Sequence, residues 1–289
     1  MATPFTNVAT LSYNGSQIRS NTAVGMIESM LNVTKYAVNE TYGAGDTLTY
    51  VVSIVNHSDS PLNGLTVSDD LAAYPFGTGT VQPLDFVGDS LQYYLNGVLQ
   101  PDPAASTDDG LVLSGISVPA GGNATIVYSA SVNGYAPLET GGAITNTVTV
   151  DSPAITAVTA EESVAVTNAA QLSLVKSVTP IPVAENGELT YTFQLMNSGN
   201  TAVVDTENAT ITDVFDPALT DISATLDGVA LVEGVDYTYD EATGEFATAN
   251  SVLSIPAATY TQDETTGEWR MIPGSVTLVV TGRISASAP

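Results

Sequence analysis

The stretch GDTLTY at residues 45–50 decides the fold, because it returns as GELTY at residues 187–191. Each copy leads on to an asparagine, Asn56 in the first case and Asn197 in the second. Around both copies, short alternating apolar runs rich in Val, Thr, Ile and Tyr are separated by Gly, Asn, Asp and Pro. This texture is typical of β-strands joined by tight turns. We therefore predict an all-β chain.

The two copies belong to a longer repeat. Residues 31–35 (LNVTK) reappear as residues 172–176 (LSLVK), and the differences 176 − 35, 191 − 50 and 197 − 56 all equal 141. A constant shift of this kind indicates two copies of one module. The further matches are residues 65–69 with 211–213, the hairpin turns Asn96-Gly97 and Asp227-Gly228, and residues 122–137 with 274–289.

The repeat is unequal at its end. The first copy continues into ITNTVTV at residues 144–150 and then into residues 164–166, whereas nothing matches after Pro289. A similar hairpin opens the chain instead, with FTNVATL at residues 5–11, a turn at Asn14-Gly15-Ser16, and residues 23–27. We expect a donor hairpin over 1–29, a complete immunoglobulin-like sandwich over 30–168, and a sandwich over 169–289 that lacks its last hairpin.

A sandwich without two strands exposes its core and one sheet edge, which another strand can complete. Only three residues separate Ile27 from Leu31, and a chain extends at most about 3.5 Å per residue, so the hairpin stays beside the first sandwich. Head-to-tail exchange between copies is therefore favoured, and it builds a filament. The expected anchors of the donor strands are Phe5, Ala9, Leu11, Val24 and Ile27. Self-closure and truncation of a longer repeat array are the alternatives.

The charge balance restricts the partners. The chain has 5 Lys and Arg against 31 Asp and Glu, a net charge of −26, which repels nucleic acid and anionic membrane surfaces. We therefore expect copies of the same chain as partners. The acidic loops at residues 102–109, 236–241 and 263–268 are expected to keep the protein soluble, and calcium binding is the alternative role. None of these loops has the spacing of a known calcium loop. No cofactor is expected.

Enzymatic residues are scarce. The chain has no cysteine and one histidine, His57, which lies in an expected turn. These counts argue against an enzyme. Residues 1–7 do not resemble a secretory signal, and residues 286–289 do not resemble a wall-sorting signal. We expect an extracellular protein of a cell or spore surface. Either its secretory signal has been removed, or the protein leaves the cell by another route such as lysis.

The repeated motifs resemble those of a large family of bacterial cell-surface repeats. The resemblance rests on Leu-x-x-x-Lys, Gly-Asp-Thr-Leu-Thr-Tyr, Val-Ser-Asp and Thr-Asn-Thr-Val-Thr-Val, and it covers nearly the whole chain. Members carry Ig-like modules in tandem on long surface proteins, as a conserved domain of unknown function. The split module makes this chain look like a pilin or spore-appendage subunit; an adhesin module cut from a longer surface protein is the alternative.

The two lysines of the chain, Lys35 and Lys176, occupy the same position of the repeat. Alternation along a strand places each on an apolar face, and it likewise turns two acids and two asparagines inward. Gram-positive pilins use such a Lys, Asp and Asn trio to form an isopeptide bond. The resemblance thus implies a bond from Lys35 to Asn146 and, between subunits, from Lys176 to Asn7, with Asp69 and Asp213 as the proton-transferring acids. The alternative is a buried Lys–Asp ion pair with Asn hydrogen-bonded nearby.

Overall fold

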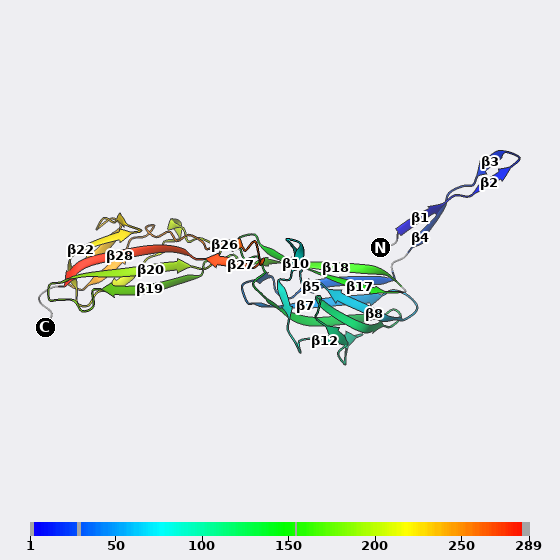
Figure 1. Ribbon diagram of the computed structural model, residues 1–289, viewed down its shortest axis with the longest axis horizontal. Coiled ribbons are helices and arrows are strands. Elements are labelled where there is room, and N and C mark those ends of the chain that lie inside the picture. The colour runs from blue at the N-terminus through cyan, green and yellow to red at the C-terminus, as the bar shows by residue number, and fades with distance from the viewer. Residues whose placement is uncertain (1–2, 28–29, 154, 285–289) are drawn as a thin grey trace. The chain divides into compact units, whose positions relative to one another are not determined.

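The computed structural model describes residues 3–27, 30–153 and 155–284. The chain forms two compact units, of which unit 1 contains residues 1–136 and 143–165, and unit 2 contains residues 137–142 and 166–289 (Figure 1). Within the described residues the only helix is a short 3₁₀ turn, η1 (Asp205–Glu207), so the all-β prediction is confirmed. No helix in these ranges is long and apolar enough to cross a membrane.

Unit 1 consists of two antiparallel sheets. The strands of the first are, in spatial order, β13 (Val98–Gln100), β12 (Gln92–Leu95), β16 (Asn123–Val132), β7 (Thr47–Asn56) and β5 (Leu31–Ala37), with β11 (Leu84–Phe86) also paired to β16. The strands of the second are β14 (Ala104–Ser106), β15 (Leu111–Val118), β8 (Leu62–Asp69), β17 (Ala143–Ser152), β18 (Ile155–Val166) and β6 (Thr41–Tyr42). A small hairpin of β9 (Tyr74–Phe76) and β10 (Gly79–Val81) lies outside them.

Strict alternation produces the core between these sheets. In β7 every second residue from Leu48 to Asn56 is buried, and β16 shows the same pattern from Ala124 to Val132. Because successive side chains of a strand point to opposite faces, one face of each sheet is apolar and packs against the other sheet. The first sheet therefore turns its β7 and β16 side chains toward those of β8, β15 and β17.

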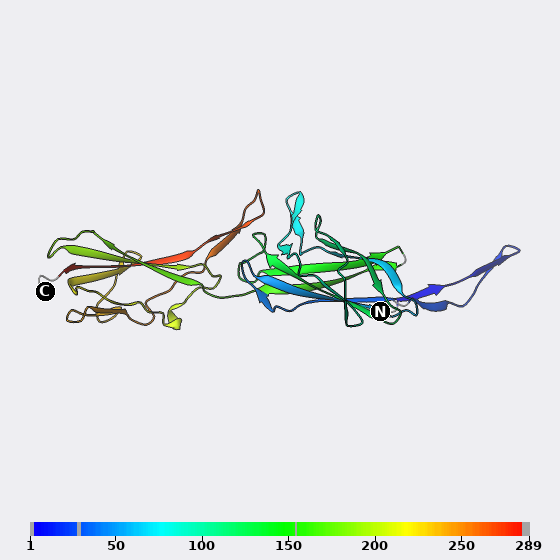
Figure 2. The same cartoon turned by 90° about the horizontal axis from the view of Figure 1, so that it is seen from below.

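Unit 2 repeats the strand order of the first sheet, without a separate counterpart of β11 among its described residues. Its strands are β19 (Leu172–Thr179), β20 (Glu188–Asn197), β28 (Gly274–Ile284), β22 (Leu219–Leu226) and β23 (Val229–Ala230), in the spatial order of their counterparts β5, β7, β16, β12 and β13. Its second layer, seen edge-on in Figure 2, contains β21 (Thr212–Val214), β25 (Glu245–Thr248) and β24 (Tyr237–Asp240), which correspond to β8, β15 and β14. A hairpin of β26 (Thr259–Gln262) and β27 (Trp269–Ile272) is an addition.

The repeat predicted from the sequence is visible in matched side-chain contacts. Asn56 Nδ2 donates to the carbonyl oxygens of Ser60, Val118 and Pro119. Its counterpart makes the same kind of contacts, since Asn197 Nδ2 donates to the carbonyl oxygens of Thr201 and Pro256. Both asparagines are fully buried, so each ties the end of one strand to a neighbouring loop.

The predicted hairpin turns are confirmed. Asn96-Gly97 joins β12 to β13 and Asp227-Gly228 joins β22 to β23, each with two consecutive positive φ angles. This geometry is the type I′ turn that suits the twist of a hairpin, and it favours Gly at the second position.

The N-terminal hairpin has two paired sections. Strand β1 (Thr3–Asn7) pairs with β4 (Ala23–Ile27), and β2 (Thr10–Tyr13) pairs with β3 (Ser16–Arg19) across a type I′ turn at Asn14-Gly15. Residues 4–26 are all exposed except Gly25, which is partly buried. The hairpin therefore has no core of its own.

Candidate functional site

Strand β17 closes the core of unit 1. It pairs with β8 on one side, where Val148 lies opposite Asp69 and Val150 lies opposite Val67, and with β18 on the other. Its inward side chains, Ile144, Asn146, Val148 and Val150, are all buried. The hairpin β17–β18 is thus the element that covers the strand β5 side of the core.

Unit 2 has no counterpart of this hairpin in the part of the chain that the structure describes. Strand β21, which corresponds to β8, pairs with β25 on one side and with no described strand on the other. On the facing sheet, Leu172 is 53% exposed where Leu31 is 3% exposed, and Leu174 is 55% exposed where Val33 is 6% exposed. The missing strands leave an apolar face and a sheet edge uncovered, and a cavity of about 510 Å³ is lined by β21, β24 and β25.

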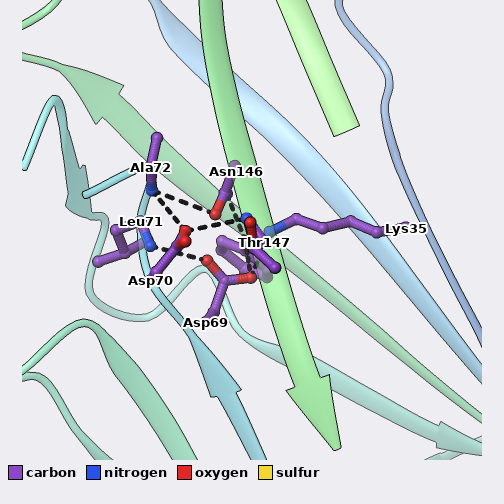
Figure 3. A network of polar contacts seen from close by, with 8 residues as sticks. Lys35, Asp69, Asp70, Leu71, Ala72, Asn146 and Thr147 are labelled. Atoms are coloured by element: carbon purple, nitrogen blue, oxygen red, sulfur yellow. Dashed lines mark hydrogen bonds and ion pairs between the residues drawn. The ribbon is translucent and has the colours of Figure 1, made fainter. Parts of the chain in front are cut away.

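The lysine of unit 1 lies in a closed polar cluster, shown in Figure 3. Lys35 Nζ lies 2.6 Å from Asp69 Oδ2, and neither side chain is appreciably exposed. The same carboxylate oxygen accepts a hydrogen bond from the Tyr128 hydroxyl at 2.5 Å. Asn146 Nδ2 donates to that hydroxyl oxygen at 3.1 Å. The structure therefore brings Lys35, Asp69 and Asn146 together, with Tyr128 joining the acid to the amide.

Backbone groups hold both ends of the cluster. The Leu71 amide donates to Asp69 Oδ1 at 3.1 Å, and the Ala72 amide donates to Asn146 Oδ1 at 3.3 Å (Figure 3). Both amides belong to the turn after β8, so this turn fixes the acid and the carboxamide relative to one another. A carboxamide whose oxygen accepts an N–H bond is polarised toward nucleophilic attack at its carbon.

Burial decides the electrostatics of this cluster. It lowers the pKa of Lys35, although the nearby Asp69 carboxylate opposes the shift. It also raises the pKa of Tyr128 and of Tyr50, whose ring stacks on that of Tyr128 at 5.6 Å between centroids. Lys35 Nζ lies 4.9 Å from the Tyr50 ring centroid, so one face of the amine is aromatic. Burial therefore makes the neutral form of the Lys35 amine easier to reach than it is in water, and it keeps both phenols protonated to higher pH.

Among the described residues, the lysine of unit 2 has its acid but no counterpart of the Asn146 carboxamide. Lys176 Nζ contacts Asp213 Oδ2, and the lysine side chain is 39% exposed. The ammonium lies 4.7 Å from the Tyr191 ring centroid and 5.3 Å from that of Phe215. Where unit 1 places Tyr128 opposite Tyr50, unit 2 places Val280 opposite Tyr191. This half-built cluster lies at the open edge of β21.

The remaining predicted residues lie on the hairpin. Phe5 is opposite Gly25 and Asn7 is opposite Ala23, so Phe5 and Asn7 share one face. Val24, also expected as an anchor, is opposite Thr6 and therefore lies on the other face of the hairpin from Phe5. Ala9 lies between β1 and β2, and Leu11 lies in β2. Ile27 ends β4 opposite Thr3, and its side chain lies outside the described residues.

Tyr50 and Tyr128 were not among the site residues predicted from the sequence. The signal was present, because both occupy inward positions of β7 and β16 and each carries a hydroxyl into an otherwise apolar face. A buried hydroxyl needs a polar partner, which could have pointed to the inward Asp69.

At the acidic loops, no group of three or more Asp, Glu or His side chains in the described ranges is arranged to hold a metal ion.

Fold and clusters together define an all-β protein of two sandwich units, one closed and one open. No family model matches the sequence, and no curated protein matches it, so the resemblance to the surface-repeat family remains an expectation. Several solved structures resemble the fold, among them bacterial pilins and the collagen-binding subdomain of the Enterococcus faecalis surface protein ACE.

The major pilin subunit BcpA of Bacillus cereus shares 12% identity over 94% of this chain and 73% of its own, with a TM-score of 0.37. The pilus backbone RrgB from Streptococcus pneumoniae shares 13% identity over 84% of this chain and 56% of its own, with a TM-score of 0.32. A family 123 glycoside hydrolase from Clostridium perfringens shares 11% identity over 48% of this chain and only 28% of its own, with a TM-score of 0.30. At these scores the likeness carries no argument about function.

Proposed function

We propose that this protein is the structural subunit of an extracellular filament, in which the hairpin of one copy completes unit 2 of the next. The observation that carries the proposal is the contrast between the two units. Strand β5 is covered in unit 1, while more than half of Leu172 and of Leu174 in its counterpart β19 is exposed. Large apolar side chains at an open sheet edge mark a site for strand addition.

The hairpin has the properties of the missing element. Its apolar side chains have nothing to cover them, and Phe5 is 51% exposed. An isolated two-stranded hairpin is marginally stable in water, so it gains from any core it can join. Burying a side chain such as Phe5 or Leu174 contributes about 1.5–3 kcal/mol each. Residues 3–27 contain no Asp or Glu in a chain of net charge −26, which limits repulsion between the hairpin and another copy.

A covalent lock in unit 1 is the second part of the proposal. The neutral amine of Lys35 attacks the carboxamide carbon of Asn146, forming a Nζ–Cγ bond. The Cγ–Nδ2 bond then breaks and ammonia leaves, with Asp69 transferring the protons between the amine and the leaving group. The burial that lowers the pKa of Lys35 and the hydrogen bond from the Ala72 amide to Asn146 Oδ1 both favour this attack. No oxidant or cofactor is required.

The same chemistry is proposed between subunits. Lys176 and Asp213 already contact one another in unit 2, and the corresponding carboxamide is Asn7 of the incoming hairpin. A bond from Lys176 to Asn7 makes the filament covalently continuous, since each subunit then holds the next through its own backbone.

Deletion of residues 1–27 tests the polymer directly. The full chain should form filaments in negative-stain electron microscopy and a ladder of multimers in size-exclusion chromatography with light scattering. The deleted chain should remain a monomer with an unchanged β-type circular dichroism spectrum, because unit 1 retains all its strands. Filaments of the deleted chain would contradict the proposal. If the full chain is also a monomer, and deletion leaves its ligand binding unchanged, an adhesin module is favoured instead.

A further inference from the structure

The N-terminal hairpin and β17–β18 have the same length and the same register at both of their ends. Asn7 lies opposite Ala23, and Asn146 lies opposite Glu162, where 146 − 7 and 162 − 23 both equal 139. At the turn, Tyr13 lies opposite Ser16, and Ser152 lies opposite Ile155, where 152 − 13 and 155 − 16 again equal 139. Two hairpins of equal length whose pairs match at both ends are interchangeable elements of one fold.

Each hairpin has one irregularity, an extra residue on its return strand, and the two irregularities lie at different places along the hairpins. Between Asn7 and Ala9 there is one residue, and two residues lie between their partners Ala23 and Ser20. Between Val150 and Ser152 there is one residue, whereas two lie between Val158 and Ile155. The extra residue therefore lies outside the forward segment from Phe5 to Leu11, in which Val8 and Ala9 connect β1 to β2, and β17 likewise has no bulge where it pairs with β8. A regular strand can dock along an edge without losing register.

Strands β8 and β21 can be aligned independently of the hairpin. Asp69 contacts Lys35 and Asp213 contacts Lys176, and the two lysines occupy matched positions of β5 and β19. Position 69 in unit 1 thus corresponds to position 213 in unit 2. On β8, Val148 of β17 lies opposite Asp69, Thr149 opposite Ser68, and Val150 opposite Val67.

From these two alignments we infer the register in which the hairpin of one copy docks on β21 of the next. The hairpin strand runs antiparallel to β21, with Ala9 opposite Asp213, Thr10 opposite Thr212, and Leu11 opposite Ile211. This inference rests on the proposed polymer and adds the residue pairs that form its joint. Leu11 then takes the inward position of Val150, and Asn7 takes that of Asn146. Asn7 lies two residues from Ala9, which is opposite Asp213.

One hydrogen bond changes partner in this register. The Phe215 amide donates to the carbonyl of Gly244, directly before β25, so the preceding Val214 amide points to the open edge of β21. It donates there to Asp213 Oδ1 at 2.9 Å. The matching amide in unit 1, that of Asp70, donates to the Thr147 carbonyl of β17 at 3.0 Å. The docked hairpin offers the Val8 carbonyl at this position, which releases the Asp213 carboxylate from the edge toward Lys176 and Asn7.

Paired cysteines test the register in the full chain, which has none of its own. Thr10 and Thr212 are exposed and face each other in the inferred joint. The double variant T10C/T212C should give disulfide-linked multimers on a non-reducing denaturing gel after mild oxidation. The matched control is T10C/V214C, in which the second cysteine lies two residues along the same face of β21, and its yield should be at least several-fold lower. The single variants T10C and T212C measure random pairing and should give dimers at most.

To keep the gel independent of a Lys176–Asn7 bond, the variants carry Lys176→Arg, which removes the nucleophile and retains the charge. Filaments that cross-link through T10C/V214C rather than T10C/T212C would overturn the register while leaving the polymer intact. Absence of any multimer for the chain without introduced cysteines would overturn both the register and the proposed function. Multimers in which neither cysteine pair forms a cross-link would also overturn the register.

Discussion

Lys35 and Lys176 stand at the same position of repeated strands, yet the side chain of Lys35 is fully buried and that of Lys176 is 39% exposed. Each contacts the equivalent acid, so the difference does not arise from the ion pair. It arises from the strand that covers Lys35 in unit 1, which also delivers Asn146. Within the described part of the chain, the second site retains the lysine, the acid and the tyrosine ring beside the lysine, and it lacks the carboxamide of this hairpin, a counterpart of Tyr128 and the hydrogen bond that the Leu71 amide donates to the acid.

The exposed face of β19 should be needed for assembly and dispensable for folding. Leu174→Asp places a charge where the hairpin must dock, so we expect loss of filaments with a change in the free energy of unfolding within about 1 kcal/mol. Val33→Asp at the matched position of unit 1 buries that charge and should cost at least about 3 kcal/mol. Electron microscopy and urea unfolding provide the two readouts. Filaments of the Leu174→Asp variant at the wild-type level would be incompatible with docking on this face.

A bond between Lys35 and Asn146 should be visible in the intact mass. The hairpin-deleted chain, which remains a monomer, is expected to be lighter than its sequence by the mass of one ammonia. Asp69→Ala and Asn146→Ala should each restore the full mass, because the first removes the proton-transferring acid and the second removes the electrophile. Mass spectrometry of the denatured proteins decides the question. A full-length mass for the unsubstituted monomer would leave an ion pair as the role of this cluster.

Alkali should destabilise unit 1 through its buried tyrosines. Burial raises the pKa of Tyr128, so the folded protein keeps a proton that an unfolded tyrosine, with a pKa near 10.0, has lost. The free energy of unfolding is therefore unaffected by this group below pH 10 and falls above it, by about 1.4 kcal/mol per pH unit. Urea titrations of the hairpin-deleted chain and of its Tyr128→Phe variant should show a shallower fall for the variant. Equal slopes above about pH 10 would show that Tyr128 does not remain protonated in the folded state.

Much of this structure could be predicted from the sequence, because strand alternation and the repeat both act locally. The inward direction of Lys35, Asp69 and Asn146 follows from period-two alternation, and the turns at Asn96-Gly97 and Asp227-Gly228 follow from residue type. The convergence of the cluster through Tyr128 depends on which strands face each other across the sandwich. That relation involves residues far apart in the chain, and alternation alone does not contain it.

The hairpin shows the limit of the same reasoning. Its resemblance to residues 144–150 predicted the inward positions of Phe5 and Asn7, which share one face. The return strand was harder to assign, because its bulge and its exact partners depend on pairing rather than composition. Val24 is apolar and exposed but lies opposite Thr6, whereas the position opposite Phe5 belongs to Gly25, where a Cβ atom would lie 2.3 Å from the Phe5 ring. A large residue and a small residue thus share the space that Ile144 and Val164 share in unit 1.

The central claim is that the core of unit 2 is completed by strands from another copy of the chain. A cryo-electron microscopy reconstruction of the filaments, at a resolution that traces side chains, tests it most directly. It should show residues 3–27 of a neighbouring subunit beside β21, with Ala9 opposite Asp213 and Asn7 next to Lys176. A reconstruction in which this edge is bare, or is filled by the hairpin of the same chain, would contradict the account.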